Sequence, residues 1–150
     1  MRSVVQRAKL CSVRVDGVVT GSIEKGLVVY LGVEETDTEE DLKYLAGKIV
    51  GLRIFPDAEG KMNLSVTEVP GCGIMAVSQF TLCADVRKGR RPSYSRAANP
   101  VEAEKLYIRF VEELKSSGLP VAEGVFQAHM EVDYINDGPV TILLDSKKRF

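Results

Sequence analysis

Four residues at the end of an apolar run, Ser78, Gln79, Phe80 and Thr81, are the first candidates for chemistry. The run before them, GIMAVS, is apolar enough for a strand buried on both faces, and we expect this strand to continue through Leu82. Polar side chains at the end of a buried strand need hydrogen-bond partners, and a ligand is one possible partner. Backbone N–H groups at such a position also suit the stabilisation of an oxyanion. The pattern alone favours a site and an internally satisfied strand end about equally.

A second unusual stretch, NDGPVT at 136–141, lies between two sequences that are typical of β-strands, 128–135 and 140–145. Proline has no backbone N–H to offer a strand ladder, and glycine weakens the interior of a strand. The local sequence therefore predicts that Gly138 and Pro139 connect two separate strands. It leaves open whether the bond between them is cis, because only about 5–6% of X–Pro bonds in folded proteins are cis.

The segment DVRKGRRPSYSR gathers cations around one aromatic residue, Tyr94. These cations are Arg87, Lys88, Arg90, Arg91 and Arg96. The whole chain has a formal net charge of −1, so only a local patch of this kind can attract a polyanion. An ordinary solvated loop is the alternative, but the clustering favours binding of an anion or of RNA.

The single histidine, His129, begins the sequence HMEVD, which places His129, Glu131 and Asp133 on one face of a predicted strand. One histidine with two carboxylates is a known ligand set for metals. Alternation of polar and apolar residues accounts for the same residues as a solvated strand face, and we favour that interpretation. A Ser–His–Asp triad would depend wholly on His129. For Cys83, a buried hydrophobic role is more common than that of a nucleophile, and no basic neighbour is evident.

The elements that position these residues are predicted from periodicity and turn signals. Asp16–Gly17 marks a hairpin turn, and 26–33 forms an apolar strand. One helix is capped by Asp37 or Thr38, stops near Gly51 and buries Leu42, Leu45, Ala46 and Ile49. A second helix begins at Asn99–Pro100, ends at Gly118 and buries Ala103, Leu106, Tyr107, Phe110 and Leu114. We predict an α+β fold for residues 1–150: a single β-rich domain, barrel-like or an open sheet, with two amphipathic helices packed on it.

Composition restricts the class of protein further. Hydrophobic residues make up 45% of the 150 residues, enough for a folded core. The N-terminus lacks the apolar region of a signal peptide, and the longest apolar run is too short to cross a membrane. Three cysteines without close pairs argue against a disulfide framework and a zinc site. We therefore expect a cytoplasmic protein that does not associate with membranes.

Taken together, these motifs resemble the D-aminoacyl-tRNA deacylase family, also called D-tyrosyl-tRNA(Tyr) deacylases, over nearly the whole chain. The resemblance is carried by VVQR, VDGVVTGSI, DLKYLAGKIVGLRIF, GKMNLSV, SQFTL, RKGRRPSY and NDGPVT. The pairing of SQFTL with NDGPVT at this separation is its most specific part. It implies the fold of these deacylases, and an enzyme that hydrolyses the ester bond of D-aminoacyl-tRNA to release free D-amino acid and tRNA.

The resemblance implies a homodimer with its active sites at the subunit interface. Ser78 to Thr81 would surround the aminoacyl ester and the 3′-terminal adenosine of the aminoacylated tRNA. Gly138 and Pro139 would enter from the partner as a cis dipeptide that rejects L-amino acids, and Arg7 would fix this dipeptide. The RNA 2′-OH would assist hydrolysis, although Thr81 matches a residue once regarded as the nucleophile.

Further residues are implied for binding of the substrate and tRNA, namely Phe126, Ala128, Met130, Arg87, Lys88, Arg90 and Arg91. Gln127 stands where the family usually has glycine, and its side chain would crowd a closely approaching adenosine. No metal or cofactor is implied, because an aminoacyl ester is already activated. The preferred D-amino acids and tRNAs are left open, as is removal of glycine from tRNA(Ala).

Two other functions are compatible with parts of the sequence. The basic loop alone fits a non-catalytic RNA-binding module, whose binding would be sensitive to salt. Thr81 as a nucleophile fits a Ser/Thr amidase that acts on peptides. SQFTL together with NDGPVT favours the deacylase over both.

Overall fold

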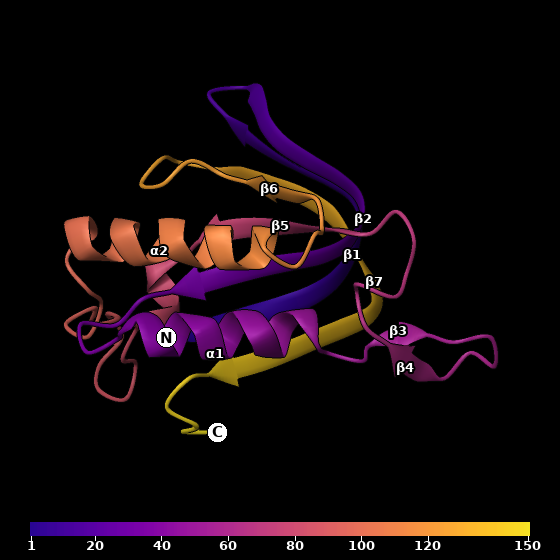
Figure 1. Ribbon diagram of the computed structural model, residues 1–150. Helices are drawn as coiled ribbons and strands as arrows, with labels where there is room; N and C mark the ends of the chain where they lie inside the picture. The colour runs from indigo at the N-terminus through magenta and orange to yellow at the C-terminus, as the bar shows by residue number, and fades with distance from the viewer.

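Five strands form one mixed sheet in the computed structural model of the protein, which describes residues 1–150 (Figure 1). In the order of the sheet, the strands are β6 (Val121–Glu123), β5 (Gly73–Ser78), β2 (Val18–Gly32), β1 (Arg2–Val15) and β7 (Glu131–Asp145). The turn between β1 and β2 places Asp16 and Gly17 at φ +50° and +78°, so the predicted hairpin is confirmed. β2 pairs with β5 in parallel, and its segment 26–32 is almost wholly buried, as expected for a central strand.

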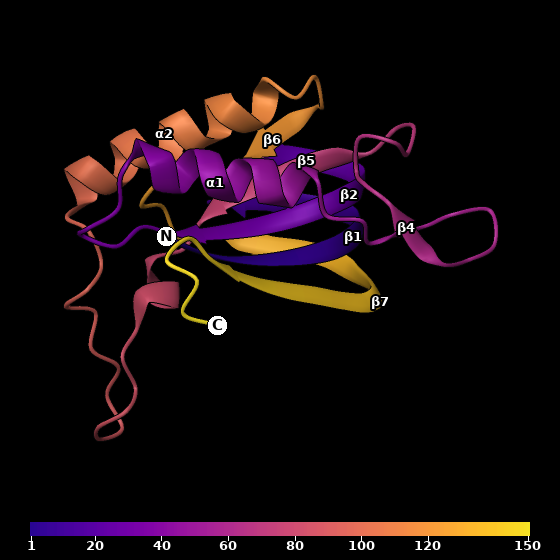
Figure 2. The ribbon, with the colours of Figure 1, turned by 60° about the horizontal axis from the view of Figure 1, so that its bottom comes forward.

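The two helices lie side by side across one face of the sheet (Figures 1 and 2). α1 (Glu39–Val50) has Thr38 as N-cap and Gly51 as C-cap, and α2 (Pro100–Lys115) begins after Asn99. The Asn99 side chain accepts a hydrogen bond from the backbone N–H of Glu102 at 3.1 Å, which satisfies one free donor of the first turn. The predicted starts of both helices are thus confirmed. No helix has both the length and the apolar composition needed to span a membrane.

Two buried clusters lie on opposite faces of the sheet. The larger, of 20 residues, fills the space between the sheet and the helices. The smaller consists of Ala8, Cys11, Val13, Val28, Met75 and Val77. No helix covers this second face, so half-buried side chains such as Tyr30, Met130 and Val132 pack over it instead. The predicted α+β fold with two packed helices is confirmed, and the sheet is open, with β6 and β7 as its edges.

The expected strand through Leu82 is wrong, because β5 ends at Ser78 and η1, a turn of 3-10 helix (Phe80–Cys83), follows. The backbone N–H of Gln79 donates to the Leu31 carbonyl at 2.7 Å, and the neighbouring strand β2 ends one residue later. Without a ladder partner the chain turns, and the Leu82 N–H bonds the Gln79 carbonyl at 3.3 Å. Gly32 makes room for this turn, since a Cβ there would lie 3.0 Å from the Gln79 carbonyl oxygen.

The prediction of two strands around NDGPVT is also wrong, because β7 runs without a break from Glu131 to Asp145. It pairs with β1, where Gln6 faces Thr141 and Ala8 faces Asn136. One residue of β1 therefore opposes four of β7, and those four form a bulge. An edge strand accommodates proline here because its outer side has no ladder partner.

The short hairpin of β3 (Phe55–Pro56) and β4 (Met62–Leu64) projects beyond the end of the sheet near this bulge (Figure 1).

Candidate functional site

A cavity of about 760 Å³ opens at the end of β5, a volume typical of small-molecule sites. Six of the seven residues predicted for the pocket, all except Thr81, line it together: Ser78, Gln79, Phe80, Phe126, Ala128 and Met130. The remaining lining residues are Tyr30, Val77, Ala98, Pro100, Gln127, His129 and Val132. Of those that the sequence interpretation missed, Tyr30 carried a signal, because it is the one hydroxyl in the otherwise aliphatic segment 26–33.

Thr81 does not line this cavity, and its side chain is exposed. Its hydroxyl has no hydrogen-bond partner, so no base is positioned to activate it as a nucleophile. The backbone, unlike this hydroxyl, offers groups that are suited to catalysis. Neither the N–H of Phe80 nor that of Thr81 is bonded within the chain. The first N–H groups of any helical turn lack internal acceptors, and here two successive donors are left at the mouth of a cavity.

Contacts with distant parts of the chain hold the turn η1 in place. The Arg2 guanidinium donates to the Leu82 carbonyl at 3.0 Å and lies 3.4 Å from the buried carboxylate of Asp145. Cys83 is buried beneath, its thiol donates to the Val33 carbonyl at 3.5 Å, and burial raises its pKa to about 11. The interpretation of Cys83 as a buried hydrophobic residue is therefore confirmed.

Gln127 occupies a glycine-like conformation in the segment between β6 and β7. Its φ is +62°, in the left-handed region that side chains disfavour, and the next N–H, from Ala128, bonds the Val125 carbonyl at 3.2 Å. The backbone thus keeps the shape that a glycine would adopt, while the Gln127 side chain is exposed at the cavity. Phe126 beside it packs on Tyr107, with ring centroids 5.9 Å apart.

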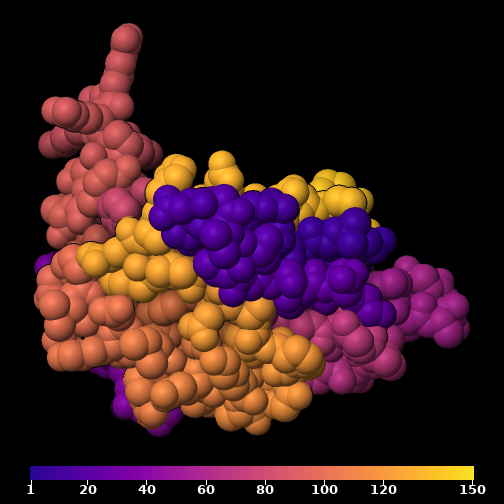
Figure 3. Space-filling model, turned by 90° about the horizontal axis from the view of Figure 1, so that it is seen from above, coloured from indigo at the N-terminus to yellow at the C-terminus, as the bar shows by residue number.

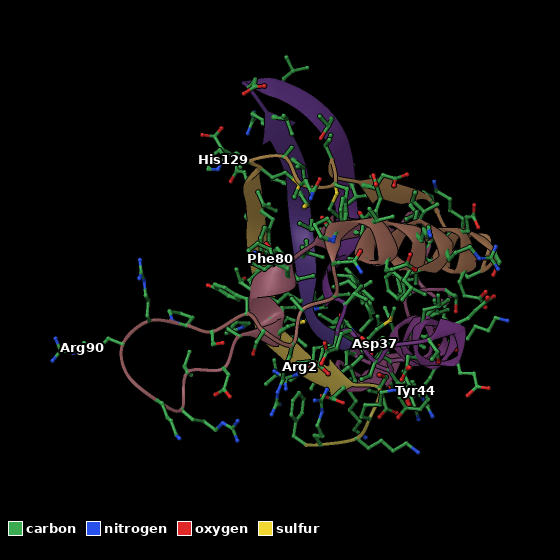
Figure 4. The ribbon with its side chains drawn as sticks, turned by 90° about the vertical axis from the view of Figure 1, so that its left-hand side faces the viewer. Arg2, Asp37, Tyr44, Phe80, Arg90 and His129 are labelled. Atoms are coloured by element: carbon green, nitrogen blue, oxygen red, sulfur yellow. The ribbon has the colours of Figure 1, made fainter.

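His129 also lines the cavity, and Figure 4 shows it above Phe80 on the same side of the molecule. It precedes β7 rather than lying within it, but the predicted exposure pattern is confirmed: His129, Glu131 and Asp133 are exposed, and the residues between them are half-buried. Nowhere in the chain do three or more His, Cys, Asp or Glu side chains gather as a possible metal site.

The bulge of β7 holds Gly138 and Pro139, exposed and joined by a cis peptide bond. Arg7 fixes it from β1. The Arg7 Nε donates to the Asp137 carbonyl at 3.2 Å, and Nη1 donates to the Ile54 carbonyl at 2.7 Å. Asn136 adds two bonds of 3.1 Å from its Nδ2, to the carbonyls of Arg7 and Val140. Side-chain donors therefore hold the Asp137 and Val140 carbonyls on either side of Gly138–Pro139.

Within one chain the bulge and the cavity are far apart. Val132 of β7 lines the cavity, and Gly138 lies six residues further along the same strand, about 20 Å away at the normal rise of a strand. Neither Gly138 nor Pro139 lines the cavity. The structure thus brings the predicted pocket residues together in one place. It brings Arg7 and the Gly138–Pro139 dipeptide together in another, and the two groups do not meet within one chain.

The basic loop, residues 84–98, projects away from the rest of the molecule (Figures 2 and 3). Its two sides are joined where Asp85 and Ser93 exchange backbone hydrogen bonds of 2.8 and 2.9 Å. The Asp85 carboxylate binds Arg87, and this contact holds the pKa of Asp85 well below its usual range. The other cations form no ion pair and are all exposed: Lys88, Arg90, Arg91 and Arg96. Arg90 extends outward at the tip (Figure 4).

The fold and the site define an α+β protein with a cavity of small-molecule size beside a projecting cationic loop. A family model described as D-Tyr-tRNA(Tyr) deacylase matches residues 4–145, and the chain belongs to this family.

Its relatives include proteins named D-aminoacyl-tRNA deacylase from Halothermothrix orenii, 61% identical, and Desulfotalea psychrophila, 59% identical. Each match covers 100% of both chains. A solved structure named "c-Myc DNA Unwinding Element Binding Protein" is 40% identical with a TM-score of 0.90, over 97% of this chain and 98% of that chain. The predicted family is therefore confirmed.

Proposed function

We propose that residues 1–150 act as one cytoplasmic domain that hydrolyses the ester bond of D-aminoacyl-tRNA, releasing the D-amino acid and tRNA. Membership of the deacylase family and the names of relatives about 60% identical over the full chain support this reaction.

The observation that carries the proposal is the pair of unbonded N–H groups of Phe80 and Thr81 beside the cavity. An aminoacyl ester is already activated, so its hydrolysis depends on stabilising the oxyanion that forms when water attacks the carbonyl. One well-placed donor lowers such a barrier by roughly 3–4 kcal/mol. The absence of a base near the Thr81 hydroxyl fits this mechanism better than a covalent one, and the 2′-OH of the terminal ribose assists the attack of water.

The cavity supplies the binding surface for the ester and the terminal adenosine. Ser78 and Gln79 line it from the end of β5, and Phe126, Ala128 and Met130 line it from the segment that precedes β7. Aromatic and thioether side chains next to amides and hydroxyls suit a nucleoside, whose base is apolar on its faces and polar at its edges.

The Gly138–Pro139 dipeptide selects the D-configuration from the partner subunit of a homodimer. Its distance from the cavity of its own chain is the reason for assigning it to a second copy. Because Arg7 and Asn136 hold the bulge rigidly, its backbone acts by excluding an L side chain rather than by binding the D side chain. The exposed cations of the loop contact the phosphates of the tRNA. They include Arg87, Lys88, Arg90 and Arg91.

The decisive experiment compares the purified protein on D-Tyr-tRNA and L-Tyr-tRNA. We expect faster deacylation of the D-ester, with a rate that a chelator does not change. Equal rates for the two esters would contradict the chiral selection. Loss of activity with chelator would contradict a mechanism without metal and restore the metal hypothesis for His129, Glu131 and Asp133.

A non-catalytic nucleic-acid-binding module is the second candidate. The 40% identical solved structure is named as a DNA-binding protein, and the exposed cations of the loop fit such a role. This candidate predicts salt-sensitive binding of uncharged nucleic acid and no turnover of D-Tyr-tRNA. Turnover would eliminate it.

A further inference from the structure

We propose that Phe80 and Tyr94 form a stacking site for a second unpaired nucleotide of the RNA, next to the terminal nucleotide that carries the ester. The proposal rests on the proposed deacylase function. It adds a subsite that joins the pocket to the basic loop.

The two rings are in contact and yet largely open to solvent. Their centroids lie 5.0 Å apart with an interplanar angle of 65°, an edge-to-face arrangement. Phe80 is 58% exposed and Tyr94 is 39% exposed. Each ring thus leaves much of its surface free for a planar ligand. Phe80 lines the cavity and Tyr94 belongs to the loop, so the pair forms a continuous path from one to the other.

Tyr94 is held in place although it belongs to a projecting loop. The residue before it, Ser93, is fixed by its two backbone bonds to Asp85. On its other side the Tyr94 carbonyl accepts from the Ala97 N–H at 3.0 Å, and the Ala98 N–H bonds the Val33 carbonyl at 3.0 Å. The position of the ring is therefore set at the base of the loop, close to η1, and not at its tip.

The charges of the loop that carries Tyr94 identify the occupant. The cations without ion pairs, Lys88, Arg90, Arg91 and Arg96, belong to the same loop, and its single acid, Asp85, is already bound to Arg87. Aromatic rings beside a cationic surface are the arrangement by which proteins bind single-stranded nucleic acid, with bases stacked on the rings and phosphates near the cations. An unpaired base of the substrate strand fits this surface, whereas an apolar peptide would leave the cations without partners.

The test separates a substrate that has the second nucleotide from one that lacks it. We compare kcat/KM for a D-aminoacyl-tRNA with kcat/KM for the D-aminoacyl ester of adenosine alone. Tyr94→Leu should lower the ratio of the two values at least about fivefold, the scale of one lost base–aromatic stack, and Tyr94→Phe should keep the ratio. Tyr44→Leu on α1, on a different part of the molecule (Figure 4), is the matched control and should also keep it.

An unchanged ratio would overturn the proposal. With an equal loss of kcat/KM on both substrates, Tyr94 would only position Phe80, and with no loss on either it would not contact the RNA. Binding of the single-stranded RNA tetranucleotide ACCA provides a second measurement that does not need catalysis. If the wild type fails to deacylate D-aminoacyl-tRNA, the proposed function fails. An ACCA affinity about fivefold weaker in Tyr94→Leu would still support the stacking site, and an unchanged affinity would refute it.

Discussion

The end of β5 and the bulge of β7 are both places where a strand is interrupted, but they treat their polar groups in opposite ways. At the end of β5 the N–H groups of Phe80 and Thr81 have no partner. In the bulge, Arg7 and Asn136 occupy the carbonyls around Gly138. An unsatisfied group is available to a ligand, whereas a satisfied one fixes a shape. The end of β5 is therefore suited to binding the substrate, and the bulge of β7 is suited to excluding the wrong one.

A substitution that removes one free donor should produce the largest effect. Thr81→Pro deletes the N–H of Thr81 without breaking a hydrogen bond of the folded protein, and proline is tolerated in a first helical turn. We expect kcat for D-Tyr-tRNA to fall about 100- to 1000-fold, as for other lost oxyanion donors.

The matched variant Thr81→Ala keeps the N–H and removes only the exposed hydroxyl. Its kcat for D-Tyr-tRNA should fall less than about tenfold, far less than the fall that follows removal of a nucleophile. Single-turnover deacylation by both variants, with circular dichroism to verify folding, makes the measurement. A collapse of activity in Thr81→Ala would instead favour the amidase-type nucleophile.

Filling the bulge should have the next largest effect. Gly138 has φ +129°, and a Cβ there would lie 2.7 Å from Val140 Cγ2 and 3.1 Å from Arg7 Nη2. The resulting shift of the excluding backbone should lower kcat/KM about 100-fold in Gly138→Ala, the cost of a misplacement near 1 Å. Gly60→Ala is the control, since Gly60 also has a positive φ, +78°, but nothing within 4 Å of its Cβ position. Normal turnover in Gly138→Ala would contradict the assigned geometry.

Loosening the support of the bulge should cost less. Arg7→Lys keeps the charge but cannot bond both the Asp137 and Ile54 carbonyls. We expect kcat/KM for D-Tyr-tRNA to fall about tenfold, equivalent to about 1.4 kcal/mol. The preference for D- over L-Tyr-tRNA should narrow at the same time. Arg14→Lys, where the half-buried arginine lies 3.9 Å from the exposed Asp133, should change neither quantity. An unchanged preference in Arg7→Lys would show that the bulge holds its shape without this residue.

The smallest effect concerns pH. The hydrogen bond from Lys9, with Arg7 nearby, lowers the pKa of Asp137 below its ordinary value of 3.8. A carboxyl with a depressed folded-state pKa stabilises the protein above the unfolded value, and this contribution is lost as pH falls below about 3.8 toward the lower pKa. Because the pair is partly exposed, the contribution should be under about 1 kcal/mol. Thermal unfolding of the wild type and Asp137→Asn between about pH 7 and pH 3 should therefore converge at the acid end. A constant difference would refute the linkage.

The sequence predicted the helices and the central hairpin because their signals are local. Asn99–Pro100 at a helix start and Asp16–Gly17 in a hairpin determine backbone conformation within a few residues. The strand predictions at Leu82 and at Gly138 were wrong for a shared reason: each depends on a neighbouring strand. β5 stops because β2 stops, and β7 continues through Gly138–Pro139 because Arg7 on β1 accommodates a bulge.

The sequence by itself determined the family, through the paired motifs SQFTL and NDGPVT, and the type of groups available for chemistry. Only the tertiary structure decided what those groups do, because hydrogen-bond satisfaction is a property of packed neighbours and not of residue type. It left the N–H groups at the end of β5 unpaired, kept the Thr81 hydroxyl without a base, and brought Tyr94 of the loop against Phe80 of η1. It also placed the bulge further along β7, so that Gly138 and Pro139 do not line the cavity of their own chain.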